Sequence, residues 1–273
     1  MRAATLQPFF DDFPGTTLDQ EKWFIVEKNW GGQVNGIDIN GGVIRDNVCV
    51  QDGLLLLSAN GNSFAGKLRG VNRDGTRRAD GRRVGAAVAT REFFGSGRYE
   101  VRMCIIPRLG VASAMWIFHY QETSSGQIIN HEIDIELPGR AHLGGDPDYR
   151  FALASAWRGE GESEHTTHYA PLGRSLADNK FHVYRFDRFS GSDAIHPHVD
   201  FFIDNKLFTT ITSHVPSFIG RLYIGAWFPR LWAGEPQFEQ EVLKIDWVRI
   251  TPFADMHDVS GTETYPAAGM IKP

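Results

Sequence analysis

The stretch "HEIDIELPG", residues 131–139, places an acidic side chain at every second position. Glu132, Asp134 and Glu136 alternate with isoleucines, and a period of two indicates a β-strand because successive side chains point to opposite faces. One face of this strand is therefore apolar, and the other carries three carboxylates in a row. Like charges held close together destabilise a fold. The acidic face therefore needs a functional explanation.

Similar alternation recurs along most of the chain, with turn residues such as Asp52-Gly53 and Asp204-Asn205 between the runs. Many short strands with regular turn signals predict an all-β sandwich of two antiparallel sheets, one of which can be concave and hold a polymer. No linker or internal repeat interrupts the pattern, so residues 1–273 are expected to form one domain, with a core over 9–253 and a loosely held tail. The predicted strands are residues 53–59, 85–93, 97–106, 113–120, 131–137, 149–157, 180–188, 198–211, 221–228 and 242–251.

The composition argues against several classes of function. The net charge of −5 gives no general attraction to nucleic acid or to an anionic membrane. No apolar run approaches the roughly 20 residues that span a bilayer. The first residues, "MRAATLQPFFDDFPG", lack the apolar segment of a secretory signal. The protein is thus expected to be cytoplasmic, or extracellular or periplasmic if a signal was removed. Cys49 and Cys104 could form one disulfide or remain two buried free thiols.

The spacing of the acids suits glycoside hydrolysis. Residues four apart on a strand have Cα atoms about 13 Å apart, at roughly 3.3 Å per residue. Two glutamate side chains that lean together can bring their carboxyl groups to about 5–6 Å, near the separation that retaining glycosidases use. Asp134 would lie within hydrogen-bonding reach of either glutamate, and crowding would raise at least one pKa. A solvated strand face and a metal site are the alternative interpretations.

Several segments carry a resemblance to a known family. The order Glu132-Ile-Asp134-Ile-Glu136 resembles the unbulged E-x-D-x-E motif of glycoside hydrolase family 16, in its lichenase and xyloglucan-transglycosylase branch. "FFGSGRYEVRMCI", "NKFHVYRFD", "DFFIDNKLF", "WAGEP" and "KIDWVRI" resemble further family segments in the same order. The resemblance implies a concanavalin A-like β-jelly roll with a concave cleft, cleaving internal β-glycosidic bonds with retention. It also implies that Glu132 is the nucleophile, Asp134 the assisting acid and Glu136 the acid/base.

Aromatic side chains can bind the flat apolar faces of sugars by burial and stacking. Trp116 precedes the acidic strand, and Trp232 lies in "LWAGEP", which resembles a family loop over the cleft, so both are predicted to bind substrate. Trp157 and Trp227 are further candidates, and a place in the core is the alternative for all four. The expected substrate is a β-1,3- or mixed-linkage β-1,3-1,4-glucan.

A basic stretch favours a different substrate. "LRGVNRDGTRRADGRR" (68–83) crowds arginines, Arg69 among them, into a predicted loop. Arginine forks match sulfate and carboxylate oxygens, so an anionic galactan of the carrageenan or agar type is the second candidate. A solvated loop is the simpler interpretation. A transglycosylase would use the same acids, and a lectin-like binding module would share the cleft without needing them.

Asp246, in "KIDWVRI", resembles a family position that contributes to a structural calcium site. No cofactor is required for the expected chemistry, and calcium would have a structural role only. The expected partner is the polysaccharide substrate, with no nucleic acid and no membrane, and the protein is expected to be a monomer.

Overall fold

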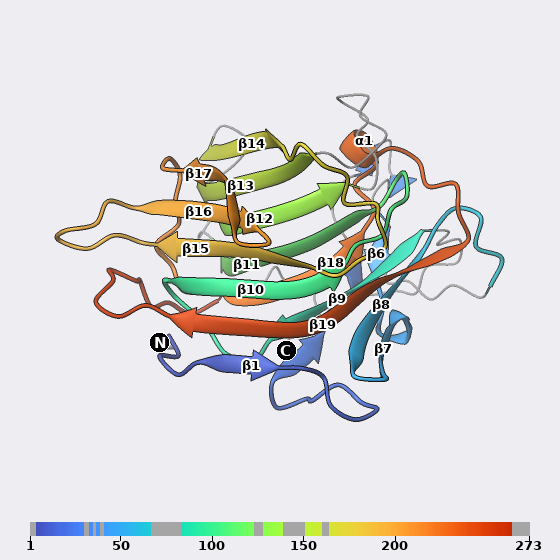
Figure 1. The fold of residues 1–273 in the computed structure, drawn as a ribbon, viewed down its shortest axis with the longest axis horizontal. Helices are drawn as coiled ribbons and strands as arrows, with labels where there is room; N and C mark the ends of the chain where they lie inside the picture. The colour runs from blue at the N-terminus through green and yellow to red at the C-terminus, as the bar shows by residue number, and fades with distance from the viewer. Residues whose placement is uncertain are drawn as a thin grey trace.

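The structure is a computed structural model of the chain. It describes residues 4–29, 33–34, 37–38, 41–66, 83–122, 128–138, 151–159 and 164–263. Two antiparallel layers of strands make up most of the molecule (Figure 1). The inner sheet is, in spatial order, β2 (Trp23–Ile25), β9 (Val84–Thr90), β18 (Arg221–Trp227), β11 (Ala112–Glu122), β12 (Ile128–Pro138), β13 (Phe151–Gly159) and β14 (His165–Pro171).

The outer sheet is centred on the long strand β19. It contains β19 (Gln240–Pro252), β10 (Gly97–Cys104), β15 (His182–Phe189), β16 (His198–Ile203) and β17 (Lys206–Ile211), with β1 (Phe9–Asp11), β8 (Leu54–Asn60) and β7 (Val48–Gln51) along the other edge of β19. The fold is therefore the predicted all-β jelly-roll sandwich.

Short elements complete the described chain. They are β3 (Lys28–Asn29), which pairs with β6 (Gly42–Val43), β4 (Gln33–Val34), which pairs with β5 (Ile37–Asp38), the 3-10 turn η1 (Arg45–Asn47) and the helix α1 (Arg230–Ala233). Among the described residues, no helix is long and apolar enough to cross a membrane.

Two of the predicted turns close two-residue hairpins. Asp52 and Gly53 join β7 to β8 with φ angles of 54° and 72°, and Asp204 and Asn205 join β16 to β17 with φ angles of 51° and 62°. Positive φ at both central positions is the geometry that matches the twist of antiparallel strands, and Asp, Asn and Gly tolerate it best. The turn chemistry visible in the sequence thus fixes the register of both hairpins.

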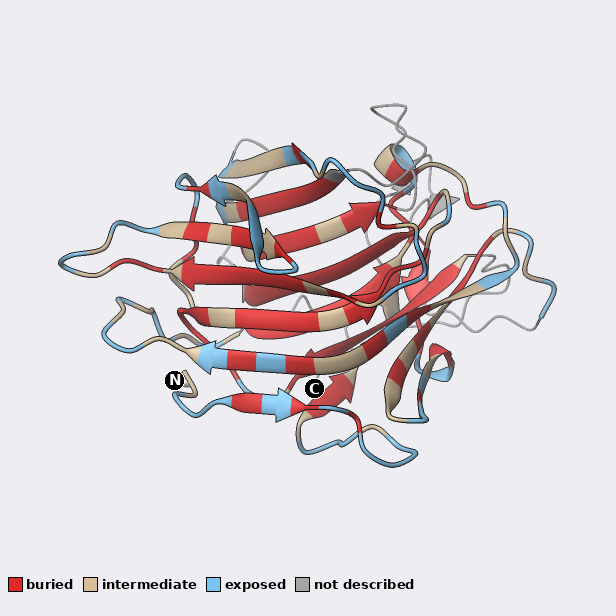
Figure 2. Ribbon diagram, in the orientation of Figure 1, coloured by how far each residue is buried: buried red, intermediate tan, exposed pale blue. Residues whose placement is uncertain are grey.

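The alternation in β12 decides which face meets the core. Figure 2 shows that buried residues run along most strands of both sheets. Ile133 and Ile135 have no exposed surface and lie in the hydrophobic core. The intervening acids must therefore lie on the opposite face of the inner sheet. That face carries a second apolar cluster, formed by Phe24, Val26, Val43, Ala87, Ala89, Ala114, Trp116, Phe118, Tyr120 and Tyr223.

The segment after Phe253 is held more firmly than the sequence predicts. Asp258 accepts hydrogen bonds from the backbone N of Ser96 at 2.7 Å and from its hydroxyl at 3.0 Å. Glu263 accepts one from Nε of Arg221 at 3.0 Å, and both of these side chains are buried. The expectation of a loosely held tail is therefore wrong as far as residue 263, because polar side chains rather than a periodic apolar pattern fasten this segment.

The two cysteines are free thiols. Cys49 is exposed, contrary to the expectation of burial, and Cys104 is buried. The strand register connects them through Leu56 and Lys244 on the two intervening strands. Three strand spacings amount to about 14 Å, and a disulfide needs Cα atoms within about 7 Å. The alternative of one disulfide is therefore wrong.

Candidate active site

The three acids line one face of β12, which lies between β11 and β13. Glu132 is directly opposite Trp157 of β13, and Asp134 is directly opposite Trp116 of β11. The register between strands, which the sequence does not show, thus sets an indole beside two of the acids.

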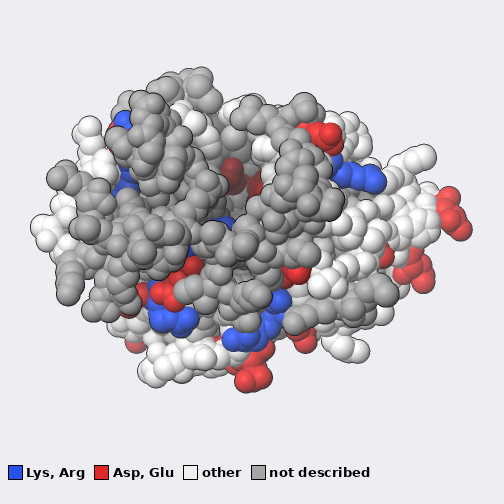
Figure 3. Space-filling view, turned by 180° about the vertical axis from the view of Figure 1, so that it is seen from behind, with Lys and Arg blue, Asp and Glu red and all other residues white. Residues whose placement is uncertain are grey.

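A pocket of about 280 Å³ opens over this face of β12. Figure 3 shows acidic atoms inside a hollow on this side of the molecule. The pocket is lined by Glu132, Asp134, Glu136, Trp116, Trp157, Trp227 and Trp232. The structure therefore brings together all three predicted acids and all four predicted tryptophans, which come from β11, β12, β13, β18 and α1.

Two of the tryptophans donate hydrogen bonds to the acids. Nε1 of Trp157 lies 2.9 Å from Oδ2 of Asp134, and Nε1 of Trp227 lies 3.0 Å from Oε1 of Glu136. Trp232 meets the Trp227 ring edge to face, with centroids 5.7 Å apart. The indoles therefore fix the carboxyl groups as well as forming the walls.

Trp116 lines the pocket and is also buried, so it fits both interpretations that the sequence leaves open, a substrate-binding residue and a core residue. Its ring is 6% exposed and stacks on Tyr223 with centroids 5.2 Å apart, so it belongs to the apolar cluster of this face. It also lines the pocket beside Asp134. Tyr223 supports this wall from β18, where the alternation of the strand puts it on the same face as Trp227.

All three acids hold their protons more tightly than usual. Burial raises the pKa of Glu132 to about 8, with a further contribution from the charge of Glu136. Burial and the charge of Asp134 raise the pKa of Glu136 to about 8. Burial and Glu132 raise the pKa of Asp134 well above its ordinary value. The cluster therefore carries protons at neutral pH, as a general acid requires.

One charged residue near the acids was not predicted from the sequence. Nζ of Lys28 donates a hydrogen bond to Oη of Tyr120 at 2.5 Å, and its positive charge lowers the pKa of Glu132. Tyr120 can be found from the alternation of β11, because it shares a face with Trp116. Lys28 has no such signal, since a two-residue strand carries no period.

The basic loop is mostly outside the described residues, and Arg69 is among those outside. Arg83, its last residue, is described. Nη1 of Arg83 lies 2.6 Å from Oε2 of Glu235, and its side chain is largely buried. This arginine therefore already has a protein carboxylate as its partner.

The calcium prediction rests on Asp246, whose carboxylate is paired with the guanidinium of Arg102. Within the described part of the chain, no group of three His, Cys, Asp or Glu side chains is placed to hold a metal ion. Arg102 contacts Oδ2 of Asp246. Calcium also takes backbone carbonyl oxygens as ligands, so a structural calcium at Asp246 stays a prediction.

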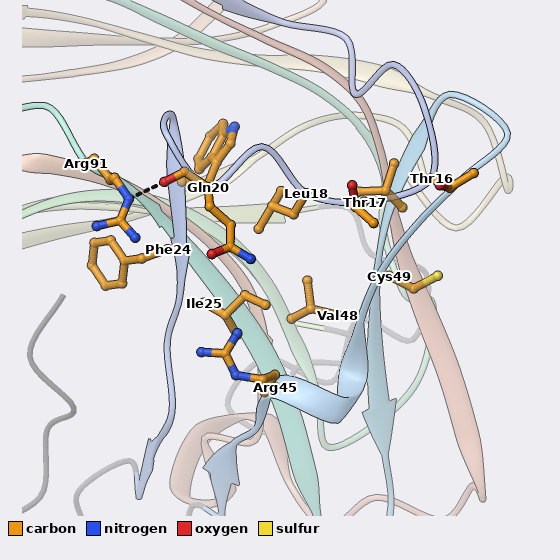
Figure 4. A pocket seen from close by; sticks show the side chains of 12 residues that line it. Thr16, Thr17, Leu18, Gln20, Phe24, Ile25, Arg45, Val48, Cys49 and Arg91 are labelled. Carbon is orange, nitrogen blue, oxygen red and sulfur yellow. Dashed lines mark hydrogen bonds between the residues drawn. The ribbon is translucent and has the colours of Figure 1, made fainter.

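A second hollow lies beside the N-terminal loop. Figure 4 shows its walls, which include Leu18, Arg45, Val48 and Cys49. The described residues that line it carry no carboxylate, so they offer no acid/base pair. Of these two hollows, only the pocket over β12 is lined by carboxyl groups.

A β-sandwich with carboxyl groups and indole walls in one hollow has the features of a glycoside hydrolase. Comparison with known proteins agrees. The family model for glycosyl hydrolases family 16 matches residues 47–249. The chain belongs to this family, which confirms the resemblance seen in the sequence and the prediction of a glycoside hydrolase. Among curated protein sequences, none matches this chain.

Solved structures with the same fold are distant in sequence. A prokaryotic β-1,3-1,4-glucanase (lichenase) from a mouse hindgut metagenome matches with a TM-score of 0.64 at 22% identity, over 90% of this chain and 99% of that chain. The Bacillus licheniformis β-glucanase matches with a TM-score of 0.64 at 20% identity, over 90% and 98%. LamA from Z. galactanivorans, in complex with laminaritriose and laminaritetraose, matches with a TM-score of 0.63 at 18% identity, over 89% and 97%.

Proposed function

We propose that the protein is a retaining endo-β-glycanase that hydrolyses a β-1,3- or mixed-linkage β-1,3-1,4-glucan. The observation that carries the proposal is the row Glu132, Asp134 and Glu136 in a pocket walled by four tryptophans. Membership of family 16 supports an endo-acting β-glycanase. The chemistry needs no cofactor, since carboxyl groups supply the nucleophile and transfer the proton.

In the first step, an ionised Glu132 oxygen attacks the anomeric carbon of the bound sugar. Protonated Glu136 donates its proton to the departing glycosidic oxygen, and the bond between that oxygen and the anomeric carbon breaks. The product is a covalent glycosyl-enzyme ester on Glu132 and a free sugar chain with a new hydroxyl group. The raised pKa of Glu136, about 8, suits it to this role because it keeps the proton at neutral pH.

In the second step, water replaces the enzyme at the anomeric carbon. Glu136, now ionised, takes a proton from the water as its oxygen attacks, and the ester bond to Glu132 breaks. Both carboxyl groups return to their initial states. Attack from opposite faces in the two steps retains the β configuration.

Asp134 orients the nucleophile. It forms a hydrogen bond with Glu132 and accepts another from Nε1 of Trp157 at 2.9 Å. Because its own pKa is raised well above the ordinary value, Asp134 can hold a proton and donate it to the Glu132 carboxylate. That hydrogen bond fixes the attacking oxygen and lowers the pKa of Glu132.

Two observations support a neutral glucan as the substrate. The indole walls suit the flat apolar faces of glucose units. Proteins of the same fold include a lichenase and a LamA bound to laminari-oligosaccharides. The one described arginine of the basic loop, Arg83, is paired with Glu235. A sulfated galactan therefore stays the alternative substrate, to be decided by assay.

The test is product release from barley β-glucan, laminarin, xyloglucan, agar and κ-carrageenan by the wild type and by Glu132→Gln. We expect oligosaccharides from one of the β-glucans, and a loss of turnover by about 10³-fold or more in the variant, which lacks the nucleophile. The anomeric configuration of the first product, followed by ¹H NMR, should be β.

Each other result points to a different activity. Cleavage of a sulfated galactan alone would replace glucan as the substrate, and an α-anomeric first product would overturn retention. Chain transfer to an added oligosaccharide in preference to water would identify a transglycosylase. Binding without turnover, unchanged in Glu132→Gln, would identify a lectin-like module.

A further inference from the structure

The ammonium group of Lys28 is held beside the acidic row by Tyr120. Lys28 begins β3, a short strand far from β12 in the sequence. Its Nζ donates to Oη of Tyr120 at 2.5 Å and lies 5.2 Å from the centroid of the Tyr120 ring. Lys28 is thus attached to the pocket-facing side of β11 rather than extending into solvent.

Tyr120 places this charge at one end of the acidic row. Tyr120 and Phe118 share a face of β11, with ring centroids 4.2 Å apart, and Phe118 is directly opposite Glu132 on β12. Glu136 is four residues further along β12, about 13 Å away at the Cα atoms. The charge of Lys28 accordingly acts on Glu132, whereas Glu136 interacts with Asp134 and Trp227.

The surroundings of Lys28 leave Glu132 as the carboxyl group that interacts with it most strongly. Among the described elements, β11 contributes the phenol of Tyr120, β12 contributes Glu132, and β6, which pairs with β3, contributes the uncharged Val43. The charge of Glu263 also acts on Tyr120, and Glu263 is itself paired with Arg221. Burial lowers the pKa of Lys28 to about 8, and Glu132 opposes that shift, so Lys28 is mostly protonated at pH 7.

A double-displacement mechanism needs the two glutamates in different states, one ionised and one protonated. Burial raises the pKa of both carboxyl groups. The charge of Lys28 opposes this shift at Glu132, whereas at Glu136 the opposing contribution is the neutral N–H of Trp227. We propose that Lys28 is a positioning residue whose ammonium is the counter-charge for Glu132, and that it thereby makes Glu132 the nucleophile and leaves Glu136 as the acid. This inference rests on the proposed glycanase function.

The test compares the pH dependence of kcat/KM for the wild type, Lys28→Met and Lys28→Arg on the β-glucan that the wild type cleaves. In Lys28→Met, the acidic limb, which reports ionisation of the nucleophile, should move to higher pH by on the order of one unit. The corresponding fall in kcat/KM at pH 6 is about tenfold. Lys28→Arg keeps the charge and should stay close to the wild type, as should Lys206→Met, which changes an exposed lysine on the β16–β17 hairpin.

A second measurement does not depend on turnover. In protein labelled with ¹³C at the glutamate carboxyl carbons, the signal that disappears in Glu132→Gln belongs to Glu132. Its titration midpoint should rise by on the order of one unit in Lys28→Met and stay near the wild-type value in Lys28→Arg.

The outcomes separate the two hypotheses. An active Lys28→Met enzyme with an unchanged acidic limb and an unchanged Glu132 midpoint overturns the role of Lys28 and leaves the glycanase intact. A wild type that cleaves no glycan overturns the proposed function and the assignment of roles with it. In that case, a Glu132 titration midpoint that still rises in Lys28→Met shows only that the charges of Lys28 and Glu132 interact.

Discussion

At the scale of single residues, two indole N–H groups each donate a hydrogen bond to a different acid of the site. Trp157 donates to Asp134, and Trp227 donates to Glu136. Each hydrogen bond favours the ionised carboxyl group and so opposes the effect of burial on the pKa. At Asp134 and Glu136, burial therefore raises the pKa, and the hydrogen bond from a neutral indole N–H lowers it.

Replacing Trp227 by phenylalanine should change the alkaline side of the pH profile. The variant keeps an aromatic wall but loses the N–H that stabilises ionised Glu136, so the pKa of Glu136 rises above its value of about 8. Because Glu136 must be protonated in the first step, the alkaline limb of kcat/KM should move up by about 0.5–1 pH unit. Trp232→Phe is the control, since the Trp232 ring contacts Trp227 and lines the same pocket. Equal shifts in both variants would contradict the assignment.

Alanine at Trp116 and at Trp232 should separate binding from stability. Trp116 is buried and stacked on Tyr223, so Trp116→Ala should lower the free energy of unfolding by about 3–5 kcal/mol and also raise KM. Trp232 is partly exposed on a short helix, so Trp232→Ala should raise KM while the melting temperature stays near that of the wild type. Thermal unfolding and steady-state kinetics measure both effects. A stable Trp116→Ala protein would show that the ring is not part of the supporting cluster.

At the scale of elements, alternation makes the long strands predictable. The predicted strands 113–120 and 242–251 correspond to β11 (Ala112–Glu122) and β19 (Gln240–Pro252). Two-residue strands such as β3 and β6 cannot be predicted in this way, because pairing between distant segments rather than local pattern makes them strands. This is why the acids and the tryptophans of the strands can be predicted from the sequence, whereas Lys28 cannot. Trp232, on the short helix α1, is predicted only through the resemblance of its segment to a family loop.

The segment from 254 to 263 is another element that only tertiary contacts define. Asp258 ties it to Ser96, and Glu263 ties it to Arg221, whose guanidinium also lies 4.1 Å from the ring centroid of Phe93. A buried guanidinium without its carboxylate would be an uncompensated charge. The segment therefore supplies the carboxylate that the buried Arg221 needs at the start of β18.

Neutralising Glu263 should destabilise the protein far more than neutralising a nearby exposed acid. Glu263→Gln leaves buried Arg221 without its anionic partner and should lower the free energy of unfolding by about 3 kcal/mol. Asp255→Asn, at an exposed position of the same segment, should change it by less than about 0.5 kcal/mol. Denaturant unfolding at pH 7 measures both. Equal effects would mean that the Arg221 pair does not fasten the segment.

At the scale of the whole molecule, two buried groups pull stability in opposite directions with pH. Burial lowers the pKa of His131 to about 4, from an ordinary value of 6.5, so its contribution to stability is present above pH 6.5 and is lost as the pH falls toward 4. Glu136 behaves in the opposite sense, because its pKa is raised in the folded state. His131, on the core side of β12, therefore makes the protein less stable at acidic pH. Glu136, on the pocket side, makes it less stable at alkaline pH.

The variant Glu136→Gln should show by how much ionisation of Glu136 lowers the free energy of unfolding. The folded protein holds the Glu136 proton up to about pH 8, whereas the unfolded chain releases it near 4.5. The contribution of this group to stability is therefore complete below pH 4.5 and declines as the pH rises toward 8. Glutamine can still accept the Trp227 hydrogen bond and never ionises, so it escapes that decline.

The melting temperature of Glu136→Gln, relative to the wild type, should thus be unchanged near pH 4.5. It should rise with pH until the variant is more stable by about 1 kcal/mol or more at pH 8, which corresponds to about 2–4 °C in a domain of this size. Glu239→Gln, at an exposed site, is the matched control. A difference that stays constant between pH 4.5 and 8 would contradict the raised pKa. The predicted difference means that the burial that keeps Glu136 protonated for catalysis also makes the protein less stable at neutral pH.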